Sequence, residues 1–128
     1  MTGSFTKTVL HTGSDGRARF RDEVLVLDEG TPQALLSALM PASGCRLRES
    51  PVGFRSAWHC SEHVQWVIVL SGEMQIGLRD GSVRLFRPGQ HFISADTLPE
   101  GARFDPQLHG HWSAQHGPDP LITLFLRL

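Results

Sequence analysis

Short hydrophobic segments, separated by turn sequences, run through the second half of the chain. Residues 64–70 are rich in β-branched side chains. Over residues 74–78, apolar and polar positions alternate, which is the two-residue period of a strand with one wet face. Asp80-Gly81 follows directly and is a strong hairpin signal. The same reasoning predicts further strands at 83–85, 91–94 and 121–126.

Turn residues are dense along the whole chain, with 13 glycines and 8 prolines. Many short strands between such turns are typical of an all-β barrel or sandwich. Residues 31–40 leave two alternatives open. Thr31 as a cap, Pro32 at the first position and leucines at helical spacing predict a short helix, while an irregular or extended arm is equally compatible. Residues 1–18 are expected to be an arm or edge segment.

Length and composition restrict the class of protein. With 128 residues there is room for one domain, and 40% hydrophobic with 20% charged residues is an ordinary globular composition. A formal charge of −1 gives no basic stripe, so nucleic acid is not an expected partner. We find no apolar stretch of about 20 residues and no signal-like leader, so a membrane is not expected either. Two cysteines favour a reduced, cytoplasmic setting.

Two histidine clusters carry the candidate chemistry. In an extended strand, alternate side chains share a face. The face expected to look inward carries His59, Ser61, His63 and Gln65, and the opposite face carries Cys60, Glu62, Val64 and Trp66. A row of imidazole, hydroxyl and carboxamide groups suits a polar cavity better than a packed core.

The second cluster is His109-Gly110-His111. Imidazoles on two strands can converge on one cation, because neutral imidazole is a good ligand for transition metals. We therefore expect rings from the two clusters to meet around one interior point. His11, His91 and His116 are expected to be surface or hydrogen-bonded residues instead.

These residues resemble the first motif of the cupin superfamily. Gly53, five residues and His59 match its opening, and Gln65, six residues and Gly72 match its close. Gln65 stands where the family has glutamate. Ser61 stands where the family has its second histidine. The resemblance implies an all-β fold of the cupin type, a double-stranded β-helix or jelly-roll barrel.

The second cupin motif is matched more loosely. Pro88-Gly89 resembles its opening turn, and His111, or alternatively His109, takes the place of its histidine after the polar loop at 96–108. The similarity covers residues 45–127, which would form the barrel core of a single domain spanning residues 1–128. A subgroup of small cupins carries Trp-His early, Gln in place of Glu, and Gly-His late, as this chain does.

The resemblance implies a site for a divalent transition metal (Fe, Mn, Ni or Zn) on His59, Gln65 and His111. His63 and His109 are candidates for a fourth ligand or for catalytic proton carriers. The amide oxygen of Gln65 is uncharged and should hold a metal less tightly than a carboxylate. Two functions follow: an enzyme acting on a small oxygen-rich molecule, or a metal-free sensor or carrier that binds a small molecule. A homodimer is expected in either case.

Overall fold

The computed structural model describes residues 2–128, and within them every regular element is a β-strand. The strands, in chain order, are β1 (Gly3–Thr12), β2 (Ala18–Leu27), β3 (Glu29–Thr31), β4 (Ala34–Leu36), β5 (Cys45–Ser50), β6 (Gln65–Ser71), β7 (Glu73–Gly77), β8 (Val83–Phe86), β9 (His91–Ala95), β10 (Trp112–His116) and β11 (Leu121–Arg127). The chain is therefore all-β, as the alternating pattern predicts.

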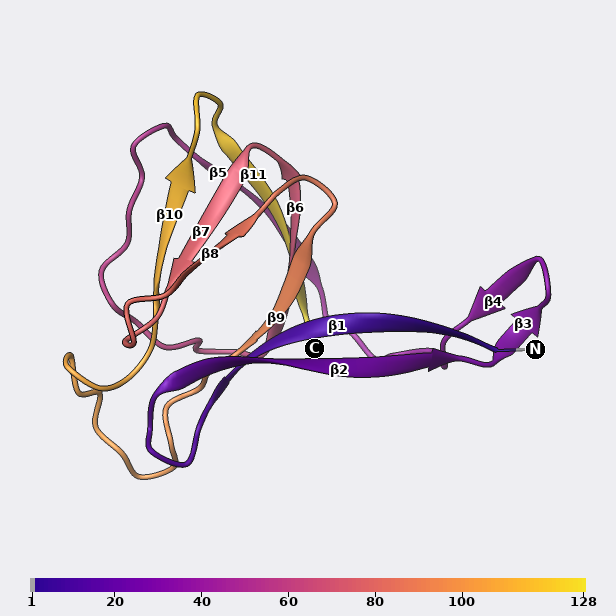
Figure 1. The fold of residues 1–128 in the computed structure, drawn as a ribbon, viewed down its shortest axis with the longest axis horizontal. Helices are drawn as coiled ribbons and strands as arrows, with labels where there is room; N and C mark the ends of the chain where they lie inside the picture. The colour runs from indigo at the N-terminus through magenta and orange to yellow at the C-terminus, as the bar shows by residue number, and fades with distance from the viewer. Residues whose placement is uncertain (1) are drawn as a thin grey trace.

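Two sheets make up the body of the molecule. The larger has the order β2-β1-β9-β6-β11-β5, and the smaller has the order β10-β7-β8. All neighbours are antiparallel except β1 and β9, which are parallel. Figure 1 shows β10, β7 and β8 standing opposite β5, β11 and β6, while the β1–β2 ribbon extends beyond them toward the β3–β4 hairpin.

The core lies between the two sheets. Its buried side chains come from both of them, namely Leu10, Ala18, Val67, Val69, Met74, Ile76, Leu78, Phe86, Phe92 and Leu121. The rings of Phe86 and Phe92 are 4.7 Å apart between centroids, and they join β8 to β9. Burial of apolar surface between the sheets stabilises their facing arrangement.

The hydrophobic pattern predicted the strands of the second half of the chain. Strands β6, β7, β8, β9 and β11 lie where it placed them, and Asp80-Gly81 turns β7 into β8. Among residues 2–128, we find no helix of the length and hydrophobicity that crossing a membrane requires.

The helical alternative for residues 31–40 is wrong. This segment instead holds the end of β3 and all of β4, which pair across Pro32-Gln33. A helix needs an apolar surface against which to pack its hydrophobic stripe. Leu39 is 99% exposed and Leu36 is 55% exposed, so the fold offers no such surface here. The extended alternative holds.

Of residues 1–18, Met1 lies outside the described residues, and the others hold β1 and the turn into β2. β2 is one of the two edge strands of the large sheet, and β1 lies inside it, next to β9. Only residues Val9, Leu10 and His11 of β1 pair with β9. The remainder of the β1–β2 ribbon is therefore held mainly by its own ten-residue ladder.

A close contact between β7 and β10 gives a stability prediction. Gly77 faces Trp112 across the ladder, and a Cβ at position 77 would lie 1.9 Å from indole Cε2. The Gly77→Ala variant must displace this ring, so we expect a loss of about 1–3 kcal/mol in the free energy of unfolding, measured in urea. In a Trp112→Ala background the same substitution should be nearly neutral. Equal effects in the two backgrounds would contradict the contact.

Candidate functional site: a cavity lined by two paired histidines

The site is built on a backbone bridge between two distant stretches. His59 N donates to His111 O at 2.9 Å, and His111 N donates to His59 O at 2.9 Å. Gly110 makes this approach possible: it has φ +79°, and a Cβ there would lie 2.2 Å from His59 O. The segment between β5 and β6 is thereby fixed beside the start of β10.

The bridge brings the two imidazoles together. The ring centroids of His59 and His111 are 4.5 Å apart, with 56° between the ring planes. The expected convergence of the two histidine clusters is thus seen for one member of each cluster. His111 is 4% exposed, whereas His59 is open to solvent.

In both rings the Nδ1 nitrogen is already engaged. His59 Nδ1 lies 2.9 Å from the carbonyl oxygen of Ala57, which can only accept, so Nδ1 carries the proton. His111 Nδ1 lies 2.6 Å from Asp96 Oδ2 and donates to this carboxylate. Nε2 is then the nitrogen of each ring that has a lone pair for a ligand.

Asp96 anchors the polar side of the site. Its side chain is fully buried at 0% exposure, and its Oδ1 accepts a hydrogen bond from Ser61 Oγ at 2.7 Å. Ser61 Oγ also lies 2.5 Å from Ser94 Oγ. Both carboxylate oxygens are therefore hydrogen-bonded, and Asp96 fixes the tautomer and the orientation of the His111 ring.

Both imidazoles line a cavity of about 490 Å³ that is bounded by residues of both sheets. Its apolar floor is formed by Val67, Met74, Phe92 and Phe125. Its polar lining includes His59, Ser61, His63, Gln65, Ser94, His111 and Ser113. The cavity thus combines an apolar floor with a small number of polar groups, as small-molecule sites do.

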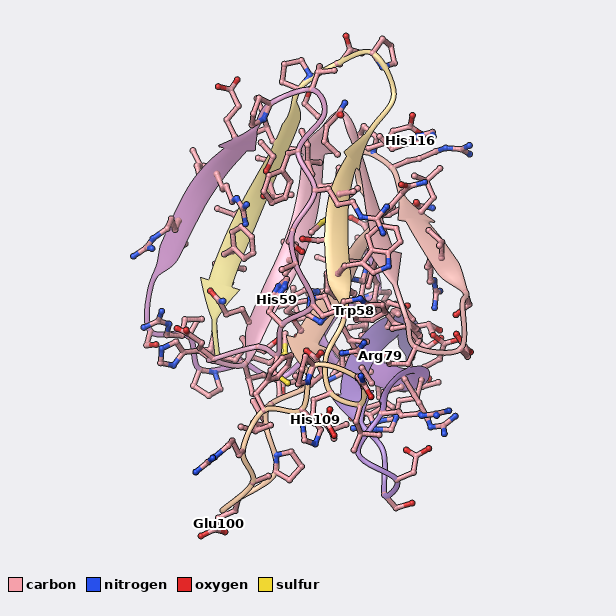
Figure 2. All side chains as sticks on the ribbon, turned by 90° about the vertical axis from the view of Figure 1, so that its left-hand side faces the viewer. Trp58, His59, Arg79, Glu100, His109 and His116 are labelled. Atoms are coloured by element: carbon pink, nitrogen blue, oxygen red, sulfur yellow. The ribbon has the colours of Figure 1, made fainter. Side chains whose placement is uncertain are left out.

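Four of the five predicted site residues line the cavity, and the fifth, His109, lies outside it. His59, Gln65, His111 and the exposed His63 line the cavity. His109 is 7% exposed but is not among the lining residues. Its Nδ1 accepts a hydrogen bond from Asp105 N at 2.9 Å. In Figure 2, His109 lies below His59, toward the loop that carries Glu100.

The alternation expected over residues 59–65 is only partly realised. Cys60 and Glu62, predicted on the opposite face, also line the cavity, and this prediction is wrong. The reason is local: residues 60–64 are outside any strand, so side chains do not alternate between two faces.

Two ionisable groups of this segment have shifted pKa values. Although His59 is partly open to solvent, the surrounding protein removes part of the water from its ring, and this desolvation is the largest cause that lowers the pKa of His59 and favours the neutral ring. Burial also raises the pKa of the Cys60 thiol, so the thiolate is disfavoured and Cys60 is a poor nucleophile.

The sequence prediction missed Asp96 and Ser94. A signal for both was available, because Phe92, Ser94 and Asp96 follow one another at alternate positions. Phe92 is a core residue, so its side chain points inward. Side chains at alternate positions of a strand share a face, which predicts that Ser94 and Asp96 also point inward.

The cavity has few groups that could bind a metal ion. Residues 2–128 contain no group of three or more His, Cys, Asp or Glu side chains placed to hold an ion. The cavity offers two imidazoles and the carboxamide of Gln65. Such a set would leave several coordination positions to water or to a ligand.

The buried Asp96 network generates a prediction. In the Asp96→Asn variant one acceptor becomes an NH₂ donor, so the hydrogen bonds from His111 and Ser61 cannot both persist in their present form. We expect a loss of about 1–3 kcal/mol in the free energy of unfolding, measured in urea at pH 7. Asp28→Asn, at an exposed position, is the matched control and should be neutral. Equal stability of the two variants would contradict this role of Asp96.

Comparisons with known proteins do not identify the chain. No family model matches it, and no curated protein matches it.

Proposed function

We propose that the protein binds a small, oxygen-rich molecule in the cavity, with His59 and His111 as its polar end. The observation that carries the proposal is the imidazole pair, 4.5 Å apart between centroids, with both Nδ1 atoms already bound to oxygen acceptors. Each Nε2 then accepts a hydrogen bond from a hydroxyl group directly, whereas a carbonyl oxygen would need a bridging water or metal ion between it and Nε2.

The size and lining of the cavity support this proposal. Its volume of about 490 Å³ falls within the range of about 300–1,000 Å³ that is usual for small-molecule sites. The apolar floor would accept a short carbon skeleton, while Ser61, Ser94 and Gln65 add further hydrogen-bonding groups.

The same geometry would support proton transfer in an enzyme. Asp96 holds the His111 ring in one tautomer, and a ring held in this way can accept a proton from a ligand at Nε2. His63 lines the cavity and stays a candidate proton carrier. His109 is a weaker candidate, because its ring is hydrogen-bonded within the loop at 96–108.

A cupin-type jelly roll is our proposal for the fold family. Two facing sheets and the glycines of the first motif support it: Gly53 has φ +90° and Gly72 has φ +75°, conformations that favour glycine. At Gly72 a Cβ would also lie 2.4 Å from Pro120 O. The two glycines that match the ends of the first cupin motif are therefore required here by the backbone conformation at positions 53 and 72.

A divalent metal held by His59 and His111, with Gln65 as a third ligand, is the second candidate. Metal-binding histidines usually donate their other ring N–H to a carboxylate or a backbone carbonyl. Both imidazoles do so here, through Asp96 and Ala57. Such an ion would act as a Lewis acid on an oxygen ligand.

The expected homodimer also stays a prediction. Large apolar side chains on the β1–β2 ribbon and after it support the prediction, since Val24, Val26 and Leu39 are all more than half exposed. A second copy of the chain that covered them would remove this surface from water.

The binding proposal is tested by thermal unfolding in the presence of sugars, 2-oxo acids and hydroxylated aromatic compounds at millimolar concentration. A ligand of the native state should raise the melting temperature, by an amount corresponding to about 2.7 kcal/mol at one hundred times its Kd. His59→Gln should weaken the effect, whereas His116→Gln, at the opposite end of β10, should not. If no compound shifts the melting temperature, the proposal is refuted.

The metal candidate is tested by elemental analysis of untagged protein and by titration with Fe²⁺, Mn²⁺, Ni²⁺ and Zn²⁺. We expect one ion per chain, lost in both His59→Ala and His111→Ala and bound more weakly in Gln65→Ala, because each substitution removes a donor. His116→Ala is the control and should keep the ion. Absence of uptake in titration would exclude this candidate while leaving metal-free binding intact.

A further inference from the structure

Three arginines stand on one side of the cavity. Arg46 and Arg48 belong to β5, and Arg127 ends β11. Positions 46 and 48 share a face of the strand because they alternate with Leu47. The ladder sets Arg46 opposite Phe125 of the apolar floor, and Arg127 opposite Gln65. The guanidinium groups therefore border both the apolar floor and the polar lining.

In the part of the chain that the structure describes, these arginines have no acidic partner. Within residues 2–128, none of the three takes part in an ion pair, whereas Arg19, Arg21 and Arg87 elsewhere on the surface all do. Arg48 instead lies over the ring of Phe54, 4.7 Å from its centroid.

The charge around the cavity is correspondingly positive. Glu62 is the single acidic side chain among the lining residues, against three guanidinium groups. Asp96, although close by, is fully buried beneath its hydrogen bonds to His111 and Ser61. An anion entering the cavity would therefore meet unpaired positive charge, and guanidinium forms strong charge-assisted hydrogen bonds with carboxylates.

We propose that the ligand is a small organic carboxylate with a short apolar body and a further oxygen substituent. Its carboxylate would bind to Arg46 and Arg127, and its apolar part would lie on the half-buried Phe125. The further oxygen, where it is a hydroxyl, would donate to Nε2 of His59 or His111, and a carbonyl oxygen in its place would be linked to Nε2 by a bridging water. This inference rests on the proposed function and narrows it to one chemical class.

The apolar floor favours an organic carboxylate over an inorganic oxyanion as the ligand. Phosphate or sulfate would satisfy the arginines but would leave the exposed part of Phe125 without contact. A carboxylate with a carbon skeleton satisfies both, since burial of apolar area adds to the charge-assisted bonds.

The test is isothermal titration calorimetry with pyruvate, 2-oxobutyrate and 4-methyl-2-oxopentanoate, each compared with its neutral amide and with inorganic phosphate. We expect the acids to bind more tightly than the amides and phosphate, with affinity rising along the series. Arg46→Gln and Arg127→Gln should each weaken binding of the acids by about tenfold or more, because each removes a charged partner. Arg103→Gln, on the loop outside the cavity, is the matched control and should change nothing.

Folding of each arginine variant is checked by its urea midpoint. If acids and amides bind equally well, and only His59→Gln weakens them, the carboxylate inference fails while the proposed function stands. If phosphate binds as tightly as the acids, the site is a general oxyanion site, and the proposal of an organic carboxylate ligand is refuted. If neither the acids nor any neutral compound binds, both the inference and the proposed function fail.

Discussion

The candidate site depends on one interaction, the pair of main-chain hydrogen bonds between His59 and His111. These bonds join the irregular segment before β6 to the start of β10, across 52 positions of sequence, and they set the distance between the two rings. Gly110 is the residue that permits them, because any Cβ would collide with His59 O. Together with the hydrogen bonds of Ser61 to Ser94 and Asp96, this pairing fixes the segment that carries His59 and His63.

Much of the fold could be predicted because its information is local. Over β6 to β9 the hydrophobic period and the Asp80-Gly81 turn specify strands without reference to the remainder of the molecule. Residues 31–40 show where local information fails. Leucines at helical spacing predict a helix only if a packing surface receives them, and the fold exposes Leu36 and Leu39 instead. The pairing order of the sheets, including the parallel contact of β1 with β9, is likewise set by long-range packing.

The site was predictable to the extent that strand parity and glycine spacing govern it. Both pointed to His59 and to one member of the His109-Gly110-His111 pair. Which of the two faces the cavity depends on the conformation of Gly110 and on the hydrogen bond from Asp105 N to His109, and no periodicity encodes either. Asp96 was missed because it lies one residue past the end of β9, where a polar side chain is normally assigned to a loop. The three arginines beside the cavity, Arg46, Arg48 and Arg127, were missed because they come together only when β5 and β11 pair.

The main-chain bridge between His59 and His111 also means that the backbone of the site does not depend on the side chains that carry its chemistry. The pairing uses only amide and carbonyl groups, which every residue except proline supplies in full, so the side chains at 59 and 111 are not needed to hold the two segments together. Mutation could exchange either imidazole for another functional group while the surrounding architecture persists. Gly110, by contrast, can hardly be replaced by another residue, because its positive φ and its contact with His59 O leave no room for a Cβ. A scaffold of this kind is well suited to diversification, because new reactivity can be introduced at two adjacent points without rebuilding the backbone that supports them.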